Sequence, residues 1–181
     1  MNANVIMDAK DIGRALTRIA HEIIEVHKGV DSLVVIGVHT RGVHLARRLC
    51  EKIAATEGRQ LPAGTIDINL YRDDWTKINR HPVVQSTHID FPLDDRQVIL
   101  VDDVLFTGRT TRAALEALLD FGRPARVELA VLVDRGLREL PIQPDYVGKV
   151  IKTDLSQMVN VMLSECDDTE MVVVEEEGPR S

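Results

Sequence analysis

Residues 98–111 join an apolar run to a turn rich in hydroxyl groups, and they read Val98-Ile-Leu-Val-Asp102-Asp103-Val-Leu-Phe-Thr107-Gly108-Arg109-Thr110-Thr111. The run Val98–Val101 carries no charge, which is typical of a strand buried on both faces of a parallel sheet. Two carboxylates end this predicted strand, and the turn after them opens a helix of alanines and leucines that ends near Gly122–Pro124. This stretch therefore predicts a strand–turn–helix unit of an α/β fold.

The turn is predicted to bind an anion, with phosphate as the best candidate. Thr107, Gly108, Thr110 and Thr111 at a helix N-terminus offer hydroxyl groups, backbone N–H groups and the positive end of the helix dipole. Ligands of an open parallel sheet bind at the carboxyl ends of its strands. The aspartates before the turn suit sugar hydroxyl groups or a hydrated Mg²⁺. The alternative is a simple capped helix with solvated acids, but the hydroxyls, the glycine and the acids converge at one strand end.

Two common nucleotide motifs are absent from this stretch. It contains neither the Gly-Lys-Ser/Thr of a P-loop nor the GxGxxG of a dinucleotide fold.

The length, composition and net charge of the chain predict one cytoplasmic domain over residues 1–181. With 44% hydrophobic and 28% charged residues, the composition suits a globular protein with a real core. No apolar run is long enough to span a membrane, and Cys50 and Cys166 lack metal-ligand spacing, which predicts inert thiols in a reducing compartment. A net charge of −7 argues against general nucleic-acid binding, and any RNA surface must be a local basic patch.

The first predicted helix is capped by Asp8 and runs to about His27. Its apolar residues fall on one side of a helix and are predicted to form the buried stripe: Ile12, Leu16, Ile19, Ile23 and Val26. The opposite side carries Arg14, Thr17, Arg18, His21 and Lys28, with Glu25 among them. This side is either a solvated helix face or a binding surface.

A second strand–turn–helix unit comes next. Residues 33–38 form an apolar strand, residues 39–42 a turn, and a helix runs from Val43 to about Ala55. The turn offers backbone N–H groups and Arg41. Because parallel strands bring their carboxyl ends to one edge, this turn is a candidate for pyrophosphate beside the first phosphate turn.

The remaining elements complete a mostly parallel, twisted sheet flanked by helices, with antiparallel edge strands and a C-terminal hairpin. Strands are predicted at 65–71, 127–133 and 146–151, and the hairpin pairs 159–163 with 171–174. Residues 72–88 have no regular period, so they form either a mobile lid over an anionic substrate or a solvated hairpin.

Residues 101–110 resemble the phosphoribosyl pyrophosphate (PRPP) motif of the type I phosphoribosyltransferases. Further stretches resemble one branch of that family, the pyrimidine operon attenuation regulators that are also uracil phosphoribosyltransferases. They are residues 15–22, 37–42, 70–74 and 133–149. The resemblance covers nearly the whole chain.

The resemblance implies transfer of the phosphoribosyl group from PRPP to uracil, giving UMP and diphosphate with Mg²⁺. Asp102 and Asp103 would be the catalytic residues, holding the ribose hydroxyl groups, and Mg²⁺ would arrive with PRPP near them without a defined set of protein ligands. The PRPP and nucleotide contacts would be Val101, Asp102, Asp103, Val104, Thr107, Gly108, Arg109, Thr110 and Thr111. Thr40, Arg41, Gly42 and the lid residue Arg72 would bind pyrophosphate, and Val133, Asp134 and Arg135 would lie at the uracil.

The resemblance also implies regulation of pyr gene expression by UMP-dependent binding to the leader of the pyr messenger RNA. Thr17, Arg18, His21, Arg138 and Lys149 match the RNA-binding positions. Two positions depart from the family, because Leu137 stands where histidine is common and Gln143 where a basic residue is common; the acidic tail also departs. Three alternatives remain: a phosphoribosyltransferase without RNA regulation, a phosphoribosyltransferase for purine bases or orotate, and a nucleotide sensor with little turnover. The family further implies a homodimer or higher homo-oligomer.

Overall fold

The computed structural model describes residues 3–71 and 86–176, and its centre is a five-stranded sheet in which all strands are parallel. The strands lie in the order β3 (Ala63–Ile66), β2 (Leu33–Val38), β4 (Gln97–Leu105), β5 (Arg126–Asp134) and β6 (Tyr146–Val150). β4 lies in the middle, and the side chains of Val98, Ile99, Leu100 and Val101 are all buried. A strand buried on both faces needs apolar residues at consecutive positions, as predicted.

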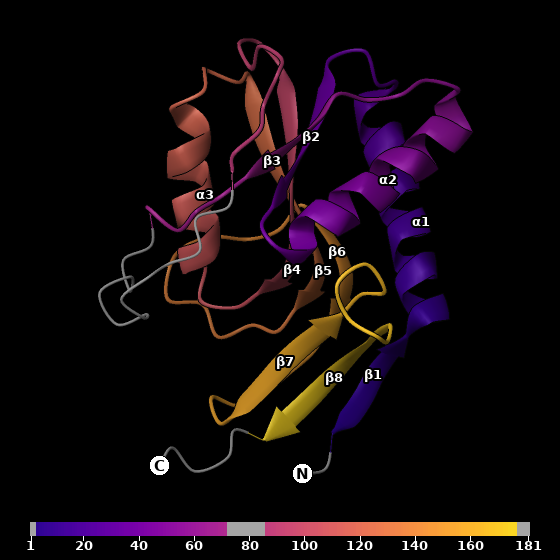
Figure 1. The fold of residues 1–181 in the computed structure, drawn as a ribbon, viewed down its shortest axis with the longest axis vertical. Coiled ribbons are helices and arrows are strands. Elements are labelled where there is room, and N and C mark those ends of the chain that lie inside the picture. Colours follow the sequence, from indigo (N-terminus) through magenta and orange to yellow (C-terminus); the bar gives the residue numbers. More distant parts are fainter. Residues whose placement is uncertain (1–2, 72–85, 177–181) are drawn as a thin grey trace.

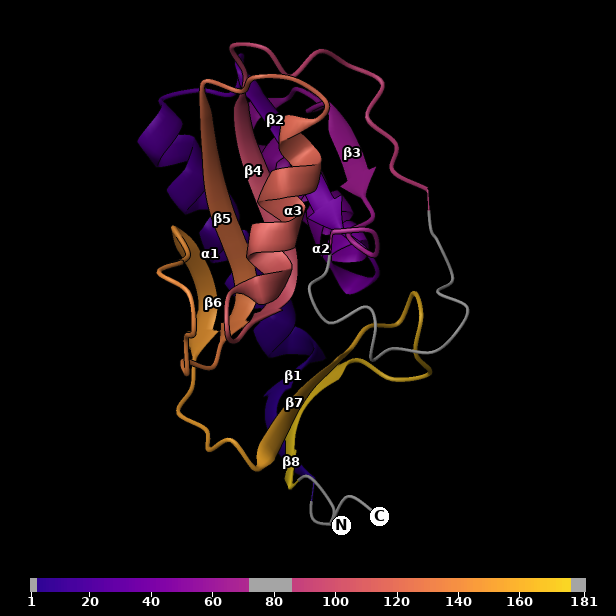
Figure 2. The ribbon, with the colours of Figure 1, turned by 90° about the vertical axis from the view of Figure 1, so that its left-hand side faces the viewer.

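Helices cover both faces of this sheet. α1 (Ala9–His27) and α2 (Arg41–Glu57) pack on one face, and α3 (Arg109–Leu119) packs on the other (Figures 1 and 2). The core therefore has two layers. One includes Ile19 and Leu49 against Ile99, and the other includes Ala114 against Leu100.

A smaller antiparallel sheet lies beyond the carboxyl ends of the parallel strands (Figure 2). It is formed by β1 (Asn4–Asp8), β8 (Met171–Glu176) and β7 (Gln157–Met162), in that order. The predicted C-terminal hairpin is thus confirmed, and the antiparallel strands form a sheet of their own instead of the edges of the main one. We call residues 163–170, which connect β7 to β8, the hairpin loop.

Side chains from α2 and from the end of β5 hold this small sheet in place. Arg48 on α2 donates to Glu165 at 2.6 and 2.7 Å and to Glu170 at 2.5 Å, both on the hairpin loop. Arg135, at the end of β5, donates to residues of the segment that leads into β7: the hydroxyl of Thr153 and the carbonyls of Asp154 and Gln157.

Most predicted elements are confirmed with small changes of boundary. The first helix begins after Asp8, whose carboxylate accepts from the N–H of Asp11 at 2.8 Å in a capping box. The second helix begins at Arg41 instead of Val43. β1 was not predicted, because a five-residue strand with one buried side chain, Met7, has too weak a pattern and is formed by pairing with β8.

Three predictions about strands and burial are wrong. β4 continues to Leu105, and Asp102 and Asp103 therefore lie within the strand, since their segment still pairs with β5. The strand predicted over 65–71 ends at Ile66, where the Asp67 carboxylate accepts from the Asn69 N–H and turns the chain. Val26 is 55% exposed, because the buried stripe of α1 ends at Ile23, one turn before the helix does.

The lid predicted over residues 72–88 lies mostly outside the described residues. Of that range only 86–88 are described, and His88 forms an isolated antiparallel bridge with Thr65.

We expect Arg48→Met to destabilise the protein by about 1 kcal/mol at pH 7, between the values for exposed and buried ion pairs. Arg48 lowers the pKa of the Glu165 carboxyl, chiefly through its hydrogen bond. A carboxyl with a lowered folded pKa stabilises the protein above its unfolded pKa, and this stability is lost as the pH falls. The difference between wild type and variant should therefore shrink below about pH 4.5.

Urea unfolding at pH 7 and pH 3.5 measures this difference. Arg59→Met is a matched control, because Arg59 pairs with Asp31 at the exposed surface and should contribute almost nothing. An equal loss for Arg48→Met at both pH values would contradict the prediction.

Candidate functional site

The predicted phosphate turn connects β4 to α3. Gly108 stands before the first residue of α3 with φ +91°, a conformation that favours glycine. The Thr107 hydroxyl accepts from the Arg109 N–H at 3.3 Å, and the carbonyl of Thr107 accepts from the N–H groups of Glu139 and Leu140. The residues 104–111 line one cavity of about 300 Å³. The structure thus brings all the predicted residues of this turn together around a space that suits a phosphate group.

The acid pair lies beside this turn in a second, polar cavity of about 290 Å³. Asp102 is 6% exposed, and its carboxylate accepts from the N–H of Asp103 at 2.9 Å. Burial, and then the charge of Asp103, raise the pKa of the Asp102 carboxyl above its ordinary value. Val104 and Thr110 line both cavities, which makes the two spaces neighbours. A buried acid of this kind is stabilised by hydroxyl donors or a cation.

The predicted pyrophosphate turn lines the same polar cavity next to the acid pair. Thr40 and Arg41 belong to its lining, and Gly42 is the second residue of α2. A Cβ on Gly42 would lie 2.4 Å from the carbonyl oxygen of Val101 and 3.2 Å from the Cα of Asp102. Only glycine therefore lets the start of α2 approach the acid pair this closely. Arg72, the fourth predicted pyrophosphate residue, lies outside the described residues.

The sequence interpretation missed four residues of this cavity. His39, Asp67, Ile68 and Asn69 also line it. Asp67 directly follows β3, the neighbour of β2 in the sheet, so the rule that pointed to Asp102 could have found it. The regular alternation of residues 65–71 concealed it by suggesting a longer strand.

The predicted uracil residues lie at the end of β5, the strand next to the acid pair. Val133 is fully buried in the core and pairs with Val104 and Lys149 in the adjacent strands. The Asp134 carboxylate accepts from the N–H of Gly136 and pairs with Arg138. Arg135 is buried, and besides its bonds to the β7 side it stacks on the Phe106 ring, with 4.0 Å from Cζ to the ring centre. The guanidinium of Arg135 thus connects the end of β5 to Phe106 and to the segment that leads into β7.

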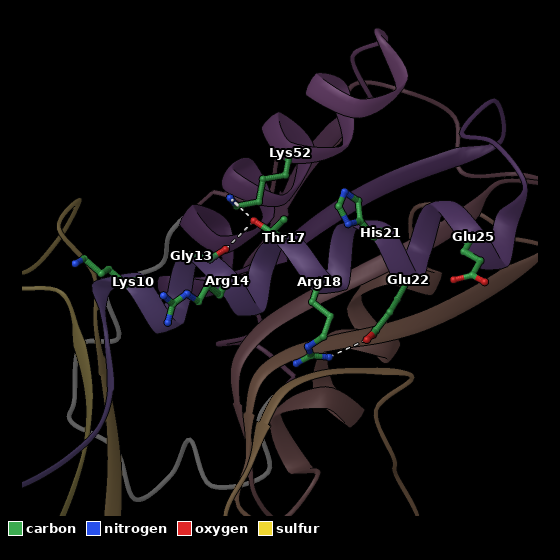
Figure 3. A pocket seen from close by; sticks show the side chains of 9 residues that line it. All are labelled: Lys10, Gly13, Arg14, Thr17, Arg18, His21, Glu22, Glu25 and Lys52. Atoms are coloured by element: carbon green, nitrogen blue, oxygen red, sulfur yellow. Dashed lines mark hydrogen bonds and ion pairs between the residues drawn. The ribbon is translucent and has the colours of Figure 1, made fainter.

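The predicted RNA-binding residues lie at two separate places. Figure 3 shows Thr17, Arg18 and His21 on the outer surface of α1, with Lys52 of α2 beside Thr17. Lys52 donates to the Thr17 hydroxyl at 2.9 Å, and Arg18 donates to the carbonyls of Val147 and Gly148 on β6. Lys10, Arg14, Glu22 and Glu25 line the same hollow. We call this surface the α1 face.

Arg138 and Lys149 make contacts of their own. Arg138 donates to the carbonyls of Phe106 and Ile142 behind the phosphate turn. Lys149 lies on β6 and donates to the carbonyl of Ile6 at 2.6 Å. Lys149 therefore lies on the same strand as the carbonyls that accept from Arg18, whereas Arg138 lies behind the phosphate turn.

Two further sequence expectations concern cysteines and membranes. Both cysteines are thiols; Cys50 is buried, and burial raises its pKa to about 12. Burial and the neighbouring Asp167 raise the pKa of Cys166, which is exposed. Among the described residues, no helix is both long enough and apolar enough to cross a membrane.

Comparison with known proteins agrees with this geometry. The phosphoribosyl transferase domain family matches residues 3–165, so the chain belongs to the phosphoribosyltransferase family. Solved hypoxanthine phosphoribosyltransferases share the fold at low identity. The enzyme of Trypanosoma cruzi has 19% identity and a TM-score of 0.71, with 96% of each chain covered. A hypoxanthine-guanine enzyme of Bacillus anthracis has 16% identity and a TM-score of 0.70, covering 97% of this chain and 99% of its own.

Within that family, the chain is a member of the PyrR group. The bifunctional protein PyrR of Desulfosudis oleivorans is 67% identical over 93% of this chain and 94% of its own length. The bifunctional PyrR proteins of Deinococcus radiodurans and Acetivibrio thermocellus are 57% and 56% identical, covering 92% and 93% of this chain and 91% and 92% of their own. The predicted family and fold class are thereby confirmed.

We expect Gly42→Ala to remove PRPP binding and to destabilise the fold by about 1–3 kcal/mol, the usual cost of overpacking. The added methyl group would overlap the Val101 carbonyl and push the pyrophosphate turn away from Asp102. Calorimetric titration with PRPP and Mg²⁺, together with urea unfolding, measures both effects. Gly13→Ala is the control, because a Cβ there meets nothing within 4 Å and should stabilise α1 slightly. Unchanged PRPP affinity in Gly42→Ala would contradict this account of the turn.

Proposed function

We propose that this protein converts uracil and PRPP to UMP and diphosphate, and that it also binds the pyr messenger RNA leader to regulate pyrimidine gene expression. One observation supports the reaction above all others. The phosphate turn, the acid pair and the pyrophosphate turn line two neighbouring cavities at one sheet edge. These are the parts needed to hold the 5-phosphate, the ribose and the diphosphate of one PRPP molecule.

The residues have distinct roles in this proposal. The N–H and hydroxyl groups of Thr107–Thr111 bind the 5-phosphate, and Asp102 and Asp103 accept hydrogen bonds from the ribose hydroxyl groups. Breaking the bond between the anomeric carbon and diphosphate develops positive charge on the sugar, which the two carboxylates stabilise. Thr40, Arg41 and Gly42 hold the diphosphate as it leaves. Positioning and electrostatics supply the catalysis, and no protein nucleophile is needed.

Magnesium fits this site as an ion that arrives with the diphosphate. Mg²⁺ commonly uses one or two protein carboxylates together with phosphate oxygens and waters. Among residues 3–71 and 86–176, no group of three or more His, Cys, Asp or Glu side chains could hold a metal ion. Asp102 and Asp103 are the carboxylates that would face a Mg²⁺–PRPP complex. The bound ion would neutralise charge on the leaving diphosphate.

Uracil is assigned to the end of β5 near Val133, Asp134 and Arg135, where mainly backbone groups would read it. The relatives' name supports pyrimidine chemistry, and the solved structures of lower identity bear on the fold alone. A panel of uracil, hypoxanthine, guanine and orotate with PRPP separates a uracil enzyme from the other phosphoribosyltransferases.

The RNA role rests on the α1 face. Lysine, arginine and histidine side chains gather there around Thr17, although the chain as a whole is acidic. Phosphate contacts from such side chains provide affinity and make it depend on salt. UMP in the catalytic cavity would be the signal that raises RNA affinity. Leu137 and Gln143 lie outside this face in the loop before β6, so the departures at these positions leave it intact.

The setting of the protein is part of the same proposal. We place it in the cytoplasm as one domain over 1–181, assembled as a homodimer or a higher homo-oligomer.

We expect the double variant Asp102→Asn/Asp103→Asn to lose UMP formation by at least about 100-fold, because two carboxylates that stabilise the charged sugar become neutral. Product formation from uracil, PRPP and Mg²⁺ measures this loss. Asp154→Asn/Asp168→Asn is a charge-matched control outside the cavity lining and should keep wild-type turnover. Wild-type protein that binds PRPP without turnover would instead show a nucleotide sensor, and full activity in the double variant would refute the catalytic assignment.

We expect His21→Ala and Lys52→Ala to weaken binding of the pyr leader several-fold at low salt, since each removes a possible phosphate contact. UMP formation should not change, because neither residue lines the catalytic cavities. Gel-shift titration with and without UMP measures the effect. Arg123→Ala removes an exposed charge beyond the C-terminal end of α3 and serves as control. If wild type shows no UMP-dependent shift, the regulatory half of the proposal fails while the enzymatic half stands.

A further inference from the structure

An ion pair joins the pyrophosphate turn to the hairpin loop. The Asp167 carboxylate accepts from Nη2 of Arg41 at 3.0 and 3.2 Å and from Nε at 3.3 Å. The carboxylate therefore forms hydrogen bonds along one edge of the guanidinium. This geometry fixes the plane of the group as well as its position. Arg41 also lines the polar cavity that contains Asp102 and Asp103. Asp167 thus acts on a cavity residue without lining the cavity itself.

Asp167 is itself held in place. Its carboxylate accepts from the backbone N–H of Leu163 at 2.9 Å, and that bond, followed by the one from Arg41, lowers the pKa of the Asp167 carboxyl. Glu165 and Glu170 lie on either side of Asp167 in the hairpin loop, and both pair with Arg48 of α2. These ion pairs fasten the loop to α2. Arg41 begins the same helix. The carboxylate is therefore fixed relative to the pyrophosphate turn by two independent sets of contacts.

The other edge of Arg41 is available to a ligand. Among the described residues, Nη1 of Arg41 has no hydrogen-bond partner, whereas Nε and Nη2 are both engaged by Asp167. An unrestrained arginine loses much rotamer freedom when it binds an anion, and a side chain already held in place loses less. Arg41 is 35% exposed at its side chain, so without Asp167 it could turn out into solvent.

We propose that Asp167 is a positioning residue for the diphosphate group, which holds Arg41 so that Nη1 meets a diphosphate in the polar cavity. This inference rests on the proposed phosphoribosyltransferase function. It predicts that Asp167 affects the affinity of this site for some ligands and not for others. PRPP and diphosphate need Arg41, whereas UMP carries only the 5-phosphate, which binds at the Thr107–Thr111 turn. Asp167 should therefore matter for the first two ligands and not for the third.

The test compares ligand affinities within each sample of the full chain. Diphosphate with Mg²⁺, and separately UMP, are titrated calorimetrically into wild type, Asp167→Asn and Asp168→Asn. We expect Asp167→Asn to weaken diphosphate binding by about five- to tenfold, within the usual range for coupled neighbours, and to leave the UMP affinity unchanged. Asp168→Asn makes the same charge change one residue further along, at an exposed side chain, and should alter neither affinity. Partial unfolding would lower the binding stoichiometry and leave both dissociation constants readable.

A double-variant cycle shows whether Asp167 acts through Arg41. Arg41→Gln alone should show the same selective loss, and adding Asp167→Asn to it should cause no further loss. In steady state, Asp167→Asn should raise KM for PRPP more than it lowers kcat. Asp167→Glu, which keeps the charge, should recover part of the diphosphate affinity.

Several results would overturn the inference. Tighter diphosphate binding in Asp167→Asn would mean that the carboxylate withholds Arg41 from the ligand. Equal losses for diphosphate and UMP, or additive losses in the cycle, would mean a general structural role. If wild type binds neither diphosphate nor PRPP, the proposed function itself fails, which is distinct from unchanged affinity in a variant whose parent binds both.

Discussion

The parallel pairing of β2 with β4 is the constraint on which the site depends. Gly37 of β2 lies opposite Val101 of β4, so both strands finish at the same edge of the sheet. The turn after β2 and the acids of β4 are then neighbours although they lie about sixty residues apart in the chain. The close approach of Gly42 to the Val101 carbonyl is the point of contact. Any side chain at position 42 would separate the two halves of the cavity.

The balance of charge in the polar cavity indicates what it can bind. Among the described residues, the carboxylates of Asp67, Asp102 and Asp103 line it, and so does Arg41, which already pairs with Asp167. An isolated anion would meet a net negative environment there. A ligand that brings hydroxyl groups and a divalent cation together with its phosphates satisfies the same groups. Mg²⁺–PRPP has this composition, which is the physical reason to prefer it over a free phosphate compound.

Arginines in this protein are used to join elements as well as to meet ligands. Arg135, Arg138 and Arg18 each donate to backbone carbonyls of a different segment. A guanidinium group suits this task because its several donors lie in one plane and it stays charged when partly buried. Sequence matching assigned these three to uracil or RNA. Their contacts in the described structure show that each also has a structural role, and variants at these positions would mix the two effects.

The sequence by itself determined the central strand, the phosphate turn, the first helix with its Asp8 cap and the C-terminal hairpin. Each of these depends on local features, namely an apolar run, a glycine among hydroxyl residues, a helical period or a capping carboxylate. It also determined the family, because whole stretches matched. Only the tertiary structure decided that Val26 is exposed, that β1 exists and that Asp167 holds Arg41. Those outcomes arise from contacts between segments far apart in the chain, and no local pattern contains the information about which distant residue will arrive.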